Sequence, residues 1–136
     1  MTRYVGLIDG EAGGYGIIFP DLPGCTAAAA TVDEVMRHAV ESVAAWIDDA
    51  IADGEQIPAA RSMEDIRTDP KVVRAIGEGA ALVLIPLVRD EGRPAKANIS
   101  MDAGLLAAID DAAAARGLTR SAFLVSAARE KITSGR

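Results

Sequence analysis

The side chains best suited to chemistry are scattered along the chain and form no recognisable catalytic set. Asp9 closes the first predicted strand and Asp21 lies in a Pro-Asp-Leu-Pro turn, whereas nuclease chemistry on two metal ions needs several converging carboxylates. The apolar run 81–88 contains no acid to complete such a cluster. The chain has a single histidine, His38, which excludes a multi-histidine metal site or a histidine-dependent triad within one chain. We therefore predict no catalytic residue, no metal ion and no cofactor.

The same residues have simpler structural interpretations. Asp9 and Asp21 are expected to be solvated turn residues, because aspartate favours tight turns. Cys25 has no histidine or second cysteine nearby in the sequence, so a small packed thiol is expected. His38 is placed on the polar face of a predicted helix.

Charge divides the chain into two unequal parts. Residues 1–92 carry 7 basic and 16 acidic side chains, a net charge of −9, whereas residues 93–136 carry 7 basic and 4 acidic, a net charge of +3. Between them, the segment 89–95 is charged and contains Gly92 and Pro94, which is typical of a linker. We predict two domains, 1–92 and 93–136, that meet different kinds of partner.

Composition favours a cytoplasmic protein that does not enter a membrane. One cysteine cannot form an intrachain disulfide, which favours a reducing compartment. No apolar run reaches the roughly 18 residues that a membrane span requires. The first residues, Met-Thr-Arg-Tyr, lack the apolar core of a signal peptide.

Periodicity predicts an α+β first domain in which strands pack on one long helix. Short apolar runs bounded by glycine or proline predict strands at 3–8, 15–20, 25–30 and 81–88. Thr31 and Glu34 form a capping box that begins the helix, and Gly54 ends it. The inward stripe of this helix is assigned to Val32, Met36, Val40, Val43, Ile47 and Ile51. Caps at Ser62 and Asp69 predict two further short helical turns.

The second domain begins with an alternating stretch and continues as two short helices. Side chains at 96, 98 and 100 share one face of the stretch, and those at 97, 99 and 101 share the other. Asp102 caps the first helix, Gly117 ends it and Thr119 caps the second. About 40 residues of this kind cannot close a core alone, so two chains are expected to pair their strands into an antiparallel ribbon above interlocked helices. A ribbon that only dimerises, or an edge strand of the first domain, is the alternative.

This stretch resembles the ribbon-helix-helix family of DNA-binding proteins, and its "GLTRSAF" turn strengthens the likeness. A two-stranded ribbon fits the major groove of DNA, where lysine and asparagine reach base edges, and helix N-termini bind phosphate. The resemblance implies base contacts by Lys96, Asn98 and Ser100. It implies phosphate contacts by Thr119, Arg120 and Ser121. The expected dimer core consists of Ala97, Ile99, Met101, Leu106, Ile109, Phe123 and Leu124.

The first domain resembles that of HicB-type antitoxins, through "PDLPGC" at 20–25, Thr31, Glu34, and the pairs Asp53-Gly54 and Ile57-Pro58. The family usually has Gly-Asp before the threonine, where this chain has Ala29 and Ala30, and the stretch 62–79 is the least typical part. The resemblance implies a partial ribonuclease-H-like fold and an antitoxin that represses its own operon. That fold raises the question of enzymatic activity, which the scattered acids argue against. The implied partners are a HicA-type toxin, which is a small basic mRNA-cleaving ribonuclease, operator DNA, and a second copy of the chain, with higher oligomers left open.

Two other functions remain open from the sequence. One is a stand-alone ribbon-helix-helix regulator without a toxin, which the absence of a neighbouring toxin gene would favour. The other is a metal-dependent nuclease, which the scattered acids disfavour and which metal-dependent cleavage lost on replacing Asp9 would support. The acidic first domain favours the antitoxin, because an acidic face can occupy a site built for phosphates.

Overall fold

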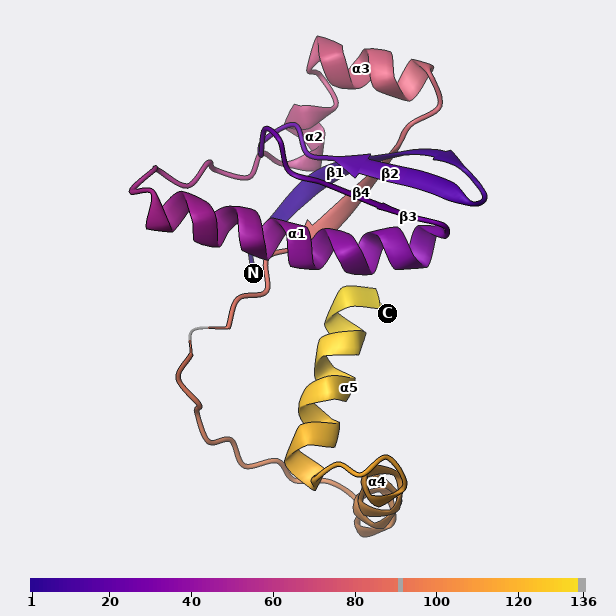
Figure 1. The fold of residues 1–136 in the computed structure, drawn as a ribbon, viewed down its shortest axis with the longest axis vertical. Helices are drawn as coiled ribbons and strands as arrows, with labels where there is room; N and C mark the ends of the chain where they lie inside the picture. Colours follow the sequence, from indigo (N-terminus) through magenta and orange to yellow (C-terminus); the bar gives the residue numbers. More distant parts are fainter. Residues whose placement is uncertain (91, 135–136) are drawn as a thin grey trace. The chain divides into compact units, whose positions relative to one another are not determined.

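The computed structural model describes residues 1–90 and 92–134, and the chain forms two compact units, Met1–Arg89 and Asp90–Arg136. The division falls inside the predicted linker. None of the helices in the described ranges is long and apolar enough to span a bilayer. The two units are described separately below (Figure 1).

The first unit is a four-stranded antiparallel sheet with the strand order β3-β2-β1-β4. The strands are β1 (Arg3–Glu11), β2 (Gly14–Ile18), β3 (Thr26–Ala29) and β4 (Ala81–Pro86). The helices are α1 (Val32–Ala52), α2 (Met63–Ile66) and α3 (Pro70–Gly77). Every predicted element of this unit is present, and the three predicted caps form, at Thr31, Ser62 and Asp69.

Alternation along β1 gives the sheet a core on each face. Tyr4 and Ile8 point toward α1 and join its buried residues, whereas Val5 and Leu7 point to the opposite face and pack with Ile66 of α2 and Val72 of α3. Figure 1 shows α1 on one side of the sheet and α2 with α3 on the other. The residues between α1 and β4 are therefore a cover for the second face of the sheet.

The predicted inward stripe of α1 is wrong at its ends. Val32 and Ile51 are 39% and 43% exposed, whereas Val35, Ala39 and Ala50 are buried. The buried face is therefore rotated from the predicted stripe and includes two alanines beside larger apolar side chains. Two alanines of β3, Ala27 and Ala29, also pack against this core.

The second unit consists of an extended segment and two helices, α4 (Ala103–Ala115) and α5 (Arg120–Ser134). Asp102 caps α4 by accepting the N–H groups of Gly104 and Leu105 at 2.8 and 3.3 Å. Gly117 has φ of 68° in the turn that follows, a conformation that glycine adopts without strain. The segment predicted as a ribbon strand forms no ladder within the described part of a single chain, since a strand needs a partner.

Candidate functional site

The apolar side chains of the second unit are largely uncovered. In its described residues only Ile109 and Ala113 are buried, and α5 has no buried residue at all. Ile99 is 65% exposed and Val125 57%. A unit this open has a face that burial against another surface would stabilise.

The predicted dimer-core residues differ in how much the single chain covers them. Ile109 is buried, whereas Leu106, Phe123, Leu124 and Met101 are half-buried. Ala97 and Ile99, at the extended segment, are exposed. All of these residues except Ile109 therefore retain apolar surface that a partner could bury.

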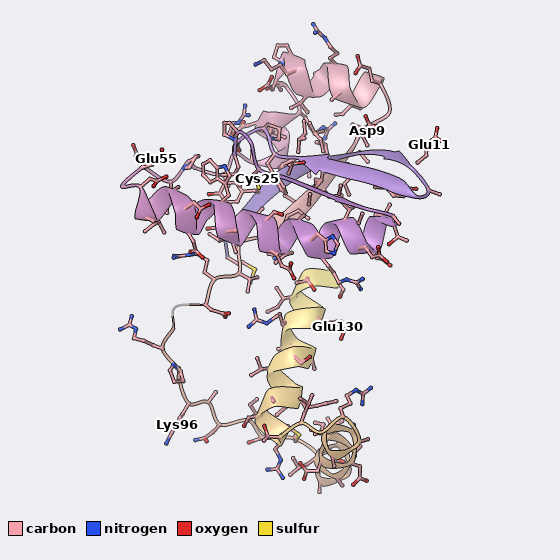
Figure 2. The ribbon with its side chains drawn as sticks, in the orientation of Figure 1. Asp9, Glu11, Cys25, Glu55, Lys96 and Glu130 are labelled. Atoms are coloured by element: carbon pink, nitrogen blue, oxygen red, sulfur yellow. The ribbon has the colours of Figure 1, made fainter. Side chains whose placement is uncertain are left out.

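The predicted base-contacting residues lie on the extended segment that precedes α4. Lys96, Asn98 and Ser100 are all exposed, and Figure 2 shows the Lys96 side chain projecting from this segment. In a paired β-strand, these alternate residues would share one side. The arrangement can present polar groups to the edges of bases in a groove.

The predicted phosphate-contacting residues surround the first turn of α5. The Thr119 hydroxyl accepts the Ala122 N–H at 3.1 Å, which forms the expected cap, and Thr119 and Ser121 are exposed. Amides of a first helical turn lack partners within the helix and favour anions. Arg120 differs, because its guanidinium donates two hydrogen bonds of 2.8 Å to the Asp110 carboxylate on α4. These bonds lower the pKa of Asp110 and raise that of Arg120.

Asp21 is not the solvated turn residue that we predicted. Its side chain is 9% exposed and accepts the Arg61 backbone N–H at 2.9 Å and the Arg61 Nε–H at 2.7 Å. Arg61 also donates to Asp69 at 3.2 Å, and hydrogen bonds to Asp21 and then Asp69 raise the Arg61 pKa. Asp21 thus links two segments that lie 40 residues apart in the sequence. No local sequence pattern identifies Arg61 as its partner.

Two further bonds hold the motif residues that carry the family resemblance. The Tyr4 hydroxyl donates to the Pro58 carbonyl at 2.8 Å, and burial, followed by the charge of Asp21, raises the Tyr4 pKa. The Trp46 Nε1–H donates to the Pro23 carbonyl at 3.0 Å. The "PDLPGC" turn and the Ile57-Pro58 pair are thus tied to the core by side chains outside the motifs, which gives both motifs a structural role.

The remaining reactive side chains are not brought together. Cys25 is buried, as predicted, and burial raises the pKa of its thiol. His38 is exposed, with its Nδ1 3.3 Å from the Ala28 carbonyl, and the exposed Asp9 accepts the Gly10 N–H. Across residues 1–90 and 92–134 no three histidine, cysteine or acidic side chains gather as metal ligands. Figure 2 shows Asp9 and Cys25 well separated.

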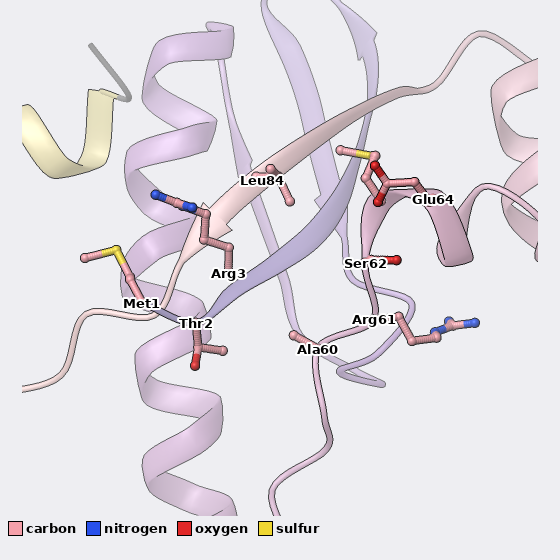
Figure 3. A pocket seen from close by; sticks show the side chains of 9 residues that line it. Met1, Thr2, Arg3, Ala60, Arg61, Ser62, Glu64 and Leu84 are labelled. Atoms are coloured by element: carbon pink, nitrogen blue, oxygen red, sulfur yellow. The ribbon is translucent and has the colours of Figure 1, made fainter.

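A pocket of about 550 Å³ opens beside β4, at the edge of the sheet (Figure 3). The Leu87 N–H donates to the Thr2 carbonyl at 2.9 Å, so by alternation Leu82 and Leu84 turn their backbone groups away from β1. The pocket is lined by Met1, Thr2, Arg3, Ala60, Arg61, Ser62, Met63, Glu64 and Leu84. An open strand edge beside a pocket is a surface on which an extended segment can dock.

Comparison with known proteins places these features in a family. Residues 4–128 match the family model described as the HicB-like antitoxin of bacterial toxin–antitoxin systems. A protein of Haemophilus phage HP1, described as an uncharacterized 14.9 kDa protein in the rep-hol intergenic region, is 31% identical over 123 residues, which are 89% of this chain and 90% of that protein.

Two solved structures extend the likeness to three dimensions. The antitoxin HicB of Burkholderia pseudomallei is 26% identical with a TM-score of 0.56, over 97% of this chain and 99% of that one. The structure titled "HicA3 and HicB3 toxin-antitoxin complex" contains a chain 26% identical with a TM-score of 0.53, over 65% of this chain and 99% of that one. The first of these likenesses spans both units.

Proposed function

Because this chain belongs to the HicB-like antitoxins of bacterial toxin–antitoxin systems, we propose that it binds and neutralises a HicA-type, mRNA-cleaving toxin in the cytoplasm. We also propose that it represses its own operon by binding operator DNA. The observation that carries this proposal is the family match over residues 4–128, which includes parts of both units. The protein acts by occupying surfaces rather than by catalysis.

The first unit, which we propose has a partial ribonuclease-H-like fold, binds the toxin. The net charge of −9 over residues 1–92 supports this assignment, since an acidic surface attracts a basic ribonuclease and competes with RNA phosphates. The solved complex of a related HicB3 with HicA3 is a precedent for such a pair. The toxin is held while its RNA-binding surface is covered.

The second unit dimerises as a ribbon-helix-helix module and binds DNA. Its exposed Ile99 and Val125 support pairing with a second copy, because each copy covers the apolar face of the other. In the paired ribbon Lys96, Asn98 and Ser100 contact base edges. Thr119 and Ser121 hold phosphates together with the first amides of α5. Association of such dimers into higher oligomers is compatible with this arrangement.

Toxin binding is tested by co-expressing the chain with the gene beside its own and purifying through a tag on the antitoxin. We expect co-purification of a basic protein, loss of its ribonuclease activity, and an association rate that falls as salt rises. A fragment of residues 1–92 should retain both effects. If no neighbouring product binds, the chain is a regulator without a toxin.

DNA binding is tested with a duplex from upstream of the gene and a scrambled duplex of equal length. The double change Lys96→Ala and Asn98→Ala should remove the preference for the upstream duplex, at about 1–3 kcal/mol for each bidentate base contact. Lys131→Ala, on the exposed surface of α5, is the control for lost charge. A dimeric double variant with unchanged preference would restrict the ribbon to dimerisation.

A further inference from the structure

Two arginines flank the turn between α4 and α5, and both are held by their own chain. Arg116 donates through Nη1 to the Ala112 carbonyl at 3.3 Å, and its Cζ lies 5.8 Å from the centre of the Phe123 ring. Arg120 is joined to Asp110 through Nε–Oδ1 and Nη2–Oδ2 contacts of 2.8 Å each. The turn therefore presents two cations that already have partners within the unit.

The Asp110–Arg120 pair spans the two helices. Asp110 lies within α4, and Arg120 is the first residue of α5. Figure 1 shows α4 nearly end-on and α5 lengthwise, so the two helices are not parallel. Two parallel N–H···O bonds fix direction as well as distance, because the guanidinium is planar. The pair therefore constrains where the first turn of α5 lies relative to α4.

Such a constraint matters because few apolar contacts fix this angle in a single chain. Only Ile109 and Ala113 are buried among the described residues of the unit. The Leu118 N–H closes the end of α4 on the Ala113 carbonyl at 2.9 Å, but that bond orients the turn and not the second helix. Among the side-chain hydrogen bonds of the described residues, the bidentate Asp110–Arg120 pair joins α4 directly to α5.

We infer that Asp110 and Arg120 form an interhelical clamp that positions the N-terminus of α5, and that Arg120 affects DNA binding through this clamp rather than by contacting a phosphate. The inference rests on the proposed DNA-binding function. The phosphate is then held by the amides at the start of α5 and by the Thr119 and Ser121 hydroxyls. Arg120 is a positioning residue, and Asp110 is its equal partner.

The clamp and a purely electrostatic effect predict opposite changes in DNA affinity for Asp110→Ala. Arg120→Ala removes a positive charge and Asp110→Ala removes a negative one, so a purely electrostatic effect on DNA affinity has opposite signs. Loss of a clamp weakens binding in both variants by a similar factor, about two- to fivefold for a surface pair of this kind. The double variant should be no worse than either single one, because both lose the same interaction.

The experiment uses full-length dimeric protein with the upstream duplex and the scrambled duplex at three salt concentrations. Asp111→Ala, on the same helix and exposed, makes the same charge change as Asp110→Ala and should not weaken binding. The exchanged variant, Asp110→Arg with Arg120→Asp, restores the pair and should recover most of the lost affinity. The salt slope should stay unchanged in Arg120→Ala.

The opposite results identify a direct phosphate contact. Arg120→Ala would then weaken both duplexes and lower the salt slope by about one for each contact, Asp110→Ala would tighten binding, and the exchanged variant would bind worst. A wild-type protein that ignores its upstream duplex contradicts the proposed function instead. In that case hydrogen exchange of the α5 first-turn amides still decides the inference: equal acceleration in Arg120→Ala and Asp110→Ala supports the clamp, and no change overturns it.

Discussion

The two units of this protein differ in how completely a single chain buries their apolar side chains. Among the residues that the structure describes, all the buried apolar ones but two belong to the first unit, which covers both faces of its sheet with its own helices. The second unit leaves Ile99 and Val125 more than half exposed. The first unit therefore buries its core within one chain, whereas the second keeps apolar surface that a partner could bury.

The largest effect should come from placing a charge on the open face of the second unit. Ile99→Asp puts a carboxylate where the ribbon of two copies would pack, and an unpaired buried charge is far more costly than the lost apolar contact. We expect the variant to sediment as separate chains at micromolar concentration and to lose DNA binding. Ile18→Asp, on a residue 57% exposed in the first unit, is the control and should keep the wild-type assembly.

A substitution in the buried core of the first unit tests whether that unit folds without a partner. Ile47 is fully buried in α1, and Ile47→Ala should lower the free energy of unfolding of the first unit by about 2–5 kcal/mol. The loss should not depend on protein concentration, because one chain supplies every contact. Urea unfolding at two concentrations tests this, and a concentration-dependent midpoint would show that the first unit also relies on a partner.

The same contrast explains how much could be predicted from the sequence. Capping residues such as Thr31 and Ser62 act within one turn, so the helix starts that they mark are confirmed. The prediction for the buried face of α1 was wrong at its ends because the surface that a helix meets, and not only the periodic pattern of the helix, decides which side chains are covered. The role of Asp21 was missed for a similar reason, since its partner Arg61 lies 40 residues away. The DNA-contacting residues stay predictions, and the sequence predicted no individual toxin-contacting residue.

An intermediate loss of stability is expected when the hydrogen bonds between Asp21 and Arg61 are removed from the first unit. Asp21→Ala leaves the Arg61 N–H without its acceptor at a partly buried position, which costs about 1–3 kcal/mol. Asp69→Asn, which can keep the Lys71 N–H bond that caps α3, should cost less, because the Asp69–Arg61 contact is longer and the Asp69 side chain is more exposed, at 24% against 9%. Thermal unfolding of both variants gives the ranking. Equal losses would mean that Arg61 is held as strongly by the second carboxylate as by the first.

The smallest expected effect is a difference between the two units in how their stability depends on acidic pH and on salt. The Lys71 N–H, and then Arg61, hold the pKa of Asp69 below its ordinary value, whereas Arg120 is the first cause of the lowered pKa of Asp110. A carboxylate with a depressed pKa stabilises the fold above its unfolded-state pKa of about 4, and this contribution is lost as the pH falls through its folded-state value.

In that acidic range, added salt should affect the stabilising contributions of Asp69 and Asp110 differently. The Asp69 contribution should resist added salt, because a backbone N–H supplies its main bond, while the Asp110 contribution should weaken, because an exposed ion pair is screened. NMR titration of both carboxyl groups in low and high salt measures this directly. An equal upward shift of both pKa values with salt would contradict the distinction, and would mean that Arg61 contributes to Asp69 as much as Arg120 does to Asp110.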